Sequence, residues 1–218
     1  MNGMEIVLPN ILKQYSTLDL PDREDYQFYL DLNQRVFYVE GVIDDVNIET
    51  GYSSISELIK RIIAINIEDM GKPIKERKPI IIAINSIGGS LDMGFALGDA
   101  IRCSTTPCIC LGIGDVMSAA FIVFISAQKR LLLPHAQLLT HQGSVSIEGG
   151  ASEAQSMMAN YKKVLSRMKS YILENTGIDE KTFNSHRKGD WYISADEAVN
   201  KYGIADKIIT NIEDIFEI

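Results

Sequence analysis

Two consecutive units, each an apolar strand, a turn and a helix, constrain the fold of this chain more than any other feature. The first strand is predicted over 80–85 and precedes a helix over about 91–102. The second strand is predicted over 108–113 and precedes a helix that begins near Ser118. Apolar runs of this length leave no polar face, which is typical of parallel strands buried on both sides. The pattern therefore predicts an α/β fold built on a parallel sheet.

Weaker signals predict the rest of the chain. Two capping boxes, Ser152 with Gln155 and Ser194 with Glu197, mark helix starts. The further elements expected are a strand over 35–40, a helix over 53–65, a loop over 72–78, strands near 130–133 and 136–140, a helix over 152–175, a short helix ending near 203, and a closing strand over 204–210. The helix over 152–175 carries one apolar stripe, formed by Met157, Tyr161, Val164, Leu165, Met168, Tyr171 and Ile172.

The length and the charge limit the domain organisation and the partners. A chain of 218 residues that is 46% hydrophobic fits one globular domain, which we predict over 28–218. Residues 1–27 lack sustained periodicity and are predicted to form an N-terminal arm that can be mobile. A net charge of -8 argues against nucleic acid as a partner.

Three cysteines and the apolar runs bear on the compartment. Cys103, Cys108 and Cys110 lie close together without distant partners, so a disulfide framework is not expected and the thiols are predicted to be buried apolar residues. No further ligands stand near them, so no metal site is predicted. The N-terminus lacks the pattern of a signal peptide, and no apolar run approaches the ~18 residues of a membrane helix. We therefore expect a cytoplasmic protein without a membrane partner.

Chemistry is expected where these strands end. The segment 85–90, Asn-Ser-Ile-Gly-Gly-Ser, is a strand–helix turn whose backbone N–H groups could hold an anion, although paired glycines also occur in simple tight turns. It matches neither a Walker loop nor a dinucleotide fingerprint. Ser118 begins a helix at the carboxyl end of the next strand, where active sites of open α/β sheets gather. Its hydroxyl is a candidate nucleophile or a plain helix cap.

A serine nucleophile needs a base, and the chain has three histidines. His141 is the best placed because it follows the predicted strand over 136–140. His135 stands at the start of that strand, and His186 is expected in a polar loop. An acid that orients the base could be Asp190, since the glycine and the aromatic residues beside it could shield it from water. The carboxylates that compete with it on chemistry alone are Asp115, Asp196 and Asp206.

These motifs resemble the ClpP family, the proteolytic subunits of the Clp protease. Residues 85–89 match the family's Asn-Ser-Pro-Gly-Gly turn, and Ser118 falls on its nucleophile. The segment 133–142 resembles its Leu-Pro to His-Gln segment, and 190–203 resembles its Asp to Ser-Ala, Glu-Ala and Tyr-Gly run. The similarity covers roughly residues 28 to 211. Ile87 in place of the proline and Ala119-Ala120 after the serine are departures from the family pattern.

The resemblance implies a serine endopeptidase that hydrolyses peptides and unfolded proteins without a cofactor. It assigns Ser118 as nucleophile, His141 as general base and Asp190 as orienting acid, with the N–H groups of Gly89 and Ala119 as the oxyanion hole. It also implies a ClpP/crotonase-like spiral of ββα units with a protruding handle helix, over 152–175. The family assembles as two stacked heptameric rings, a tetradecamer, fed by a Clp-type AAA+ ATPase in ATP-dependent proteolysis and protein quality control.

Two alternatives remain open at this point. A non-catalytic ring subunit would keep the fold without a working triad. A crotonase-type acyl-CoA enzyme would use the same spiral and its N–H oxyanion hole without a serine nucleophile.

Overall fold

A computed structural model describes residues 33–44, 54–143 and 149–216. The elements below belong to the compact unit that begins at Arg35. Residues 1–27, which are predicted to form an arm, lie outside the described ranges.

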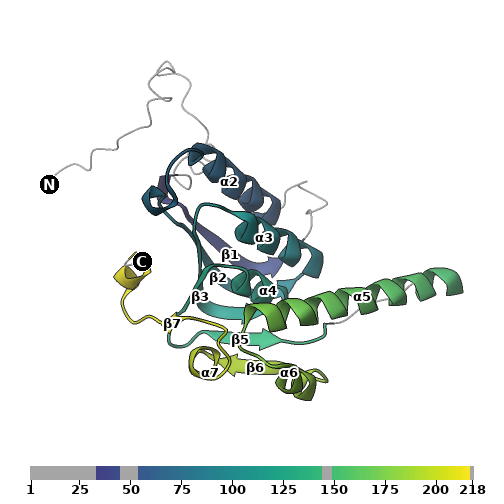
Figure 1. Ribbon diagram of the computed structural model, residues 1–218. Coiled ribbons are helices and arrows are strands. Elements are labelled where there is room, and N and C mark those ends of the chain that lie inside the picture. The colour runs from purple at the N-terminus through teal and green to yellow at the C-terminus, as the bar shows by residue number, and fades with distance from the viewer. Residues whose placement is uncertain (1–32, 45–53, 144–148, 217–218) are drawn as a thin grey trace, which may run out of the picture. The chain divides into compact units, whose positions relative to one another are not determined.

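A mostly parallel sheet is the frame of this unit (Figure 1). Five strands follow one another in parallel: β1 (Val36–Ile43), β2 (Ile80–Gly89), β3 (Cys108–Met117), β4 (Lys129–Leu132) and β7 (Lys207–Ile208). Two more leave this path: β5 (Gln137–Thr140), parallel to β3, and β6 (Trp191–Ser194), antiparallel to β5. The predicted α/β fold is confirmed.

Strand β3 changes partner halfway along its length. Its residues 109–112 pair with β4, whereas 115–117 pair with β5. At the branch, the register between β2 and β3 shifts, and the Asp115 N–H donates to Asn85 Oδ1 at 3.0 Å. A Cβ added at Gly114 would lie 2.3 Å from the same oxygen, so a side chain there would displace the Asn85 amide from this hydrogen bond. At this branch, β5 and β6 leave the path of the other five strands.

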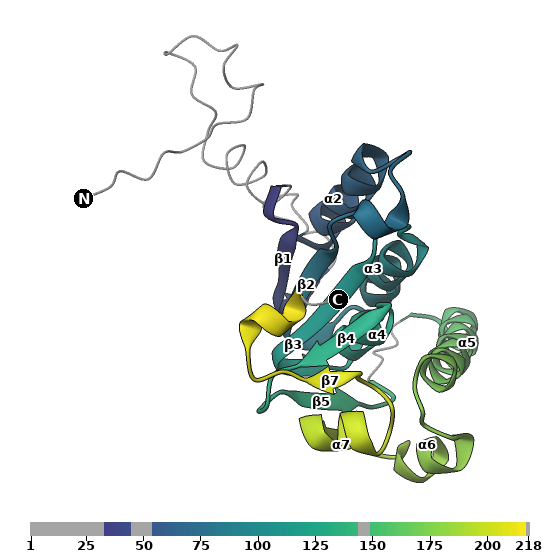
Figure 2. The same cartoon turned by 60° about the vertical axis from the view of Figure 1, so that its left-hand side comes forward.

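Three helices cover one face of β1–β3, as Figures 1 and 2 both show: α2 (Ser54–Glu68), α3 (Leu91–Cys103) and α4 (Ala119–Ile125). Every residue of α4 is buried, which explains its uninterrupted apolar sequence. On the other face, Ile209 and Ile215 of the C-terminal segment pack on Ile81, Ile109 and Leu131. The first halves of β2 and β3 are therefore buried on both sides, as their composition predicts.

A buried ion pair joins the residues that precede β1, β2 and β3. Arg35, which precedes β1, donates to both carboxylate oxygens of Asp69 at 2.5 and 2.9 Å and to the Lys78 carbonyl at 2.8 Å. Thr106 adds a hydrogen bond to Asp69 at 3.0 Å. The side chains of Arg35 and Asp69 are 7% and 1% exposed. The hydrogen bond from Arg35, outweighing the opposing effect of burial, holds the pKa of the Asp69 carboxyl well below its usual range.

Replacing Asp69 by asparagine is expected to lower the free energy of unfolding by about 3 kcal/mol at pH 7, because it leaves a buried guanidinium without its buried counter-charge. Because the folded-state pKa is lowered, the native carboxylate stabilises fully above its unfolded-state pKa of about 3.9, and this contribution is lost as the pH falls below that value. Denaturant unfolding between pH 3 and 7 measures both effects.

The control for this substitution is Glu68→Gln, since Glu68 lies 3.6 Å from the same Arg35 but its side chain is 58% exposed. Its removal is expected to cost less than about 1 kcal/mol. Equal losses in the two variants would show that the buried pair has no special weight.

The C-terminal third corrects several sequence-based expectations. Helix α5 (Ala151–Asn175) begins one residue before the predicted start, with Gly150 as its N-cap, and the Glu153 carboxylate accepts the Gly150 N–H at 3.0 Å. The predicted capping box of Ser152 with Gln155 is therefore wrong, since both residues lie inside the helix. The box of Ser194 with Glu197 is confirmed at the start of α7 (Ala195–Asn200).

Three further predictions are wrong in part. His186 ends a helix, α6 (Glu180–His186), rather than lying in a loop. The closing strand over 204–210 shrinks to the two residues of β7. Cys103 is exposed, although Cys108 and Cys110 are buried as expected. The predicted loop over 72–78 contains one 3-10 turn, Ile74–Glu76.

Among the described residues, no helix combines the length and apolarity that a membrane span requires.

Candidate active site

Ser118 occupies a strained turn between β3 and α4. Its φ of 55° and ψ of -118° lie outside the regions that residues with a side chain ordinarily adopt. The turn is held from outside, because the Ser118 N–H donates to the Leu139 carbonyl of β5 at 2.9 Å. The hydroxyl makes no capping bond to α4 and instead lies 2.8 Å from His141. The structure therefore excludes the plain helix cap as the reason for this serine.

The paired glycines bring the end of β2 against this turn. A Cβ at Gly88 would lie 2.5 Å from the Met117 carbonyl oxygen and 2.7 Å from the Ser118 Cβ. A Cβ at Gly89 would lie 2.1 Å from the Ile43 carbonyl oxygen. Both residues have positive φ, so both positions require glycine for space and for conformation. The Gly88 N–H donates to Ser86 Oγ at 3.1 Å, which holds the turn.

His141 and Asp190 come from the antiparallel pair β5–β6. Thr140 pairs with Trp191, so His141 and Asp190 follow and precede this last pair at the same end of the ladder. The His141 Nδ1 lies 3.1 Å from Asp190 Oδ1, and its Nε2 lies 2.8 Å from Ser118 Oγ. A neutral imidazole with its proton on Nδ1 satisfies both contacts, because Nε2 then accepts from the hydroxyl.

The competing residues lie elsewhere. Asp206 accepts the Arg130 N–H, and Asp196 bonds to Asn200 on α7. Asp115 lies on β3, at the branch of the sheet. His186 stacks on Trp191 with ring centroids 4.1 Å apart, and His135 lies in the turn before β5. The structure thus brings together Ser118, His141 and Asp190 and none of these alternatives.

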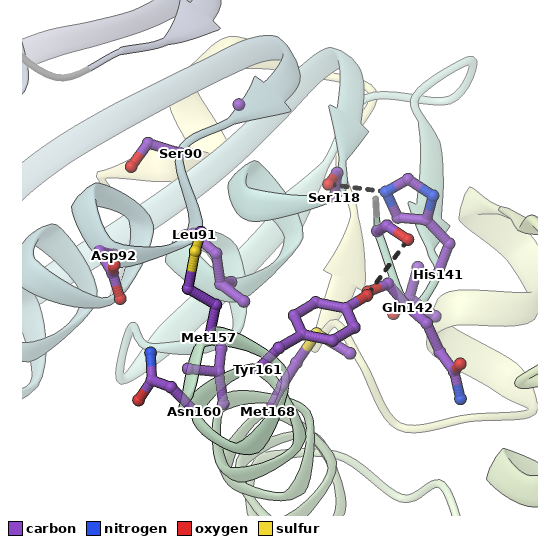
Figure 3. Close-up of a pocket in the computed structure, with 14 residues that line it drawn as sticks. Ser90, Leu91, Asp92, Ser118, His141, Gln142, Met157, Asn160, Tyr161 and Met168 are labelled. Carbon is purple, nitrogen blue, oxygen red and sulfur yellow. Dashed lines mark hydrogen bonds between the residues drawn. The ribbon is translucent and has the colours of Figure 1, made fainter. Parts of the chain in front are cut away.

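A cavity of about 490 Å³ opens beside the serine, lined by Ser118, His141, Gly89 and residues of α5 (Figure 3). The α5 residues that line it are Met157, Asn160, Tyr161, Val164 and Met168. The sequence places four of them in an apolar stripe and misses their part in the site. Asn160 has no signal in the sequence at all. Ala119, the second predicted oxyanion donor, follows Ser118 as the first residue of α4 and is buried.

Among the described residues, no group of three or more histidine, cysteine, aspartate or glutamate side chains is arranged to hold a metal ion. Burial raises the pKa of the Cys108 thiol to about 11 and that of Cys110 well above its ordinary value. Both thiols are therefore protonated at neutral pH and do not act as nucleophiles.

Chemically, a hydroxyl hydrogen-bonded to an imidazole that is itself oriented by a carboxylate can lose its proton as it attacks an electrophile. The strained turn presents that hydroxyl to a cavity large enough for a side chain of a substrate. This combination suits acyl transfer.

Comparisons with known proteins point the same way. A family model described as Clp protease matches residues 37–212. The ATP-dependent Clp protease proteolytic subunit 2 of Treponema denticola is 38% identical over 142 residues, which cover 64% of this chain and 70% of that protein. The subunit 2 of Pseudomonas aeruginosa is 33% identical over 63% of this chain and 69% of its own. The subunit 1 of Protochlamydia amoebophila is 28% identical over 84% of both chains.

Proposed function

Because the chain belongs to the Clp protease family, a family of peptidases, we propose that it is a serine endopeptidase with Ser118, His141 and Asp190 as its catalytic triad. The observation that carries the proposal is the hydrogen-bonded series Asp190–His141–Ser118, with distances of 3.1 and 2.8 Å. A non-catalytic ring subunit or a crotonase-type enzyme has no need of that alignment.

The triad works by proton transfer through His141. Ser118 Oγ attacks the peptide carbonyl while His141 Nε2 takes the hydroxyl proton and then gives it to the leaving amine. Asp190 keeps the proton of the resting imidazole on Nδ1 and stabilises the imidazolium that forms. A water molecule, deprotonated by the same imidazole, then attacks the acyl group, and the imidazole returns that proton to Ser118 Oγ as the bond between the serine and the acyl group breaks. No cofactor is required for these steps.

The N–H groups of Gly89 and Ala119 are the proposed oxyanion hole. Both belong to segments that converge on Ser118, and the neighbouring Gly88 N–H is committed to Ser86 Oγ at 3.1 Å. Each donor of this kind contributes roughly 3 kcal/mol to stabilising the transition state in comparable hydrolases. The tight glycine turn is then explained, because it lets backbone donors approach the carbonyl oxygen of the substrate closely.

The assembly is proposed by analogy with the family. Residues 28–218 form one peptidase domain, which assembles into two stacked heptameric rings in the cytoplasm, and residues 1–27 form an arm. Unfolded proteins enter the chamber with the help of a Clp-type AAA+ ATPase, while short peptides enter unaided.

A fluorophosphonate probe tests the chemistry directly, since it forms a covalent adduct only with an activated hydroxyl. We expect one adduct, on the peptide that contains Ser118, with simultaneous loss of peptide hydrolysis. A folded protein that the probe does not label would support the non-catalytic ring subunit instead.

Helix α5 leads to a prediction about assembly. Met168 and Ile172 pack within the subunit, whereas Met157 and Met158 are 41% and 39% exposed. Buried apolar surface stabilises by roughly 25 cal/mol per Å², so these exposed side chains suit an interface with a second copy. The double substitution Met157→Glu and Met158→Glu is expected to give half-size particles by analytical ultracentrifugation.

The control is Ser170→Glu, which adds a charge at an exposed polar position of the same helix and is expected to leave the particle size unchanged. An unchanged sedimentation coefficient in the double variant would show that the first half of α5 is not part of the proposed interface. Leu165 and Met168 are less suitable for this test, because Met168 is only 6% exposed within its own subunit and a charge there would disturb the fold.

A further inference from the structure

Tyr161, in the middle of α5, reaches across the cavity to the segment that follows His141 (Figure 3). Its hydroxyl donates to the Gln142 carbonyl at 2.9 Å and lies 3.4 Å from the Gly143 carbonyl. Both oxygens can only accept, so the single hydroxyl proton is shared between two successive carbonyls of the chain. The contact joins residues 18 and 19 positions apart, one on α5 and the others on the segment that follows β5.

The two sides of His141 are held in different ways. On its amino side, Leu139 and Thr140 pair with β3 and β6, and the Leu139 carbonyl also accepts from the Ser118 N–H. The strand β5 ends at Thr140, so the pairing of the sheet does not extend past His141. Gly143 has a φ of +73°, so the chain has left the extended conformation of β5 at this residue. The Tyr161 hydroxyl therefore fixes the carboxyl side of the histidine.

The hydroxyl is itself well anchored. Met168 and Ile172 bury the second half of α5 against the body of the unit, and the Tyr171 hydroxyl lies 2.7 Å from Ser126 Oγ on the carboxyl side of α4. Tyr161 stands two helical turns before Met168, on the same side of the helix. A half-buried ring on a packed helix loses less entropy in holding a carbonyl than a flexible surface side chain does.

We propose that Tyr161 is a positioning residue for the triad, which holds the backbone after His141 so that Nε2 stays aligned with Ser118 Oγ. This role rests on the proposed function, because it assigns His141 as the general base. It links the orientation of α5 to the alignment of the triad through one hydroxyl group. A misplacement of about 1 Å at a catalytic group is sufficient to slow a reaction considerably.

The test is Tyr161→Phe, which removes the hydroxyl and keeps the ring in the cavity. We expect kcat for a short fluorogenic peptide to fall roughly tenfold, while KM changes less than about twofold, because the hydroxyl holds the base rather than the substrate. The reaction of Ser118 with a small fluorophosphonate should slow by a similar factor. The control Tyr192→Phe, on β6 with its side chain exposed, should match the wild type.

Hydrogen exchange adds a readout that does not depend on activity. In Tyr161→Phe, the amides of a peptide that ends at Gly143 should exchange faster than in the wild type, while those of β2 keep their rates. Wild-type protein that neither hydrolyses peptides nor reacts with the probe would contradict the proposed function. An unchanged kcat, or a rise in KM that accounts for the whole loss, would overturn the positioning role even if the exchange becomes faster.

Discussion

Replacing Ser118 by alanine is expected to abolish peptide hydrolysis, with a loss in kcat on the order of 10⁶-fold. The substitution deletes the one oxygen that lies 2.8 Å from His141 Nε2. Alanine and serine share the same Cβ, so the positive φ of 55° at this turn imposes a similar strain on both. The fold and the particle size should therefore be retained. Initial rates on a fluorogenic peptide, together with a melting curve, measure the two outcomes separately.

The matched control for the nucleophile is Ser156→Ala. Its hydroxyl donates only to the Ser152 carbonyl of the same helix, at 3.0 Å, and it is exposed. It should keep the activity of the wild type. Hydrolysis by Ser118→Ala at a rate near that of the wild type would refute the serine mechanism, and a loss of folded protein would instead assign the residue a structural role.

The order of the main elements could be predicted from the sequence because burial on both faces leaves a plain signal. The apolar runs over 80–85 and 108–113 lie at the start of β2 and β3, and both strands continue beyond them. The extension of β2 through its paired glycines depends on pairing with β1, whose register shifts between Gly41 and Val42. Such pairing is a tertiary effect, so the composition of the segment does not reveal it.

Helix ends were harder to predict when two patterns competed. Ser152 with Gln155 and Gly150 with Glu153 have the same three-residue spacing, and the helix uses the second pair. Helix α6 is not predicted from the sequence, because Phe183 is its one buried residue and a single residue gives no apolar periodicity. A readable signal was nevertheless present, since the Asp179 side chain caps this helix by accepting the Thr182 N–H at 2.7 Å.

The candidate site depended on long-range pairing in the same way. Ser118 and His141 could be placed at strand ends from local patterns, but strand β6 was not predicted and its pairing with β5 is what brings Asp190 to His141. Chemistry alone therefore left several carboxylates open, and the family resemblance favoured Asp190. The role of Tyr161 was invisible for a similar reason, because the carbonyls it contacts lie on a segment far from it in sequence.

Replacing Asp190 by asparagine is expected to lower kcat by about 10³- to 10⁴-fold, through the tautomer of His141. The amide group of asparagine can donate to Nδ1, which moves the imidazole proton to Nε2. The protonated Nε2 faces Ser118 Oγ and cannot accept the hydroxyl proton. In triads with a buried aspartate the same substitution lowers kcat by about 10⁴-fold. The expected loss here can be smaller, because the Asp190 side chain is 55% exposed and water weakens its electrostatic effect on His141. The tautomer effect is not screened, so the loss remains large.

The control that separates these carboxylates is Asp115→Asn. Asp115 lies on β3, which ends one residue before Ser118, and its backbone N–H, rather than its carboxylate, makes the bond to Asn85. The substitution keeps that N–H and is expected to change kcat by less than about threefold, in line with other substitutions that remove no specific contact. Steady-state kinetics on both variants at one pH decide the assignment. If Asp115→Asn were the crippling change and Asp190→Asn were harmless, the 3.1 Å contact between Asp190 and His141 would have no catalytic role, and the acid of the triad would have to be sought on β3.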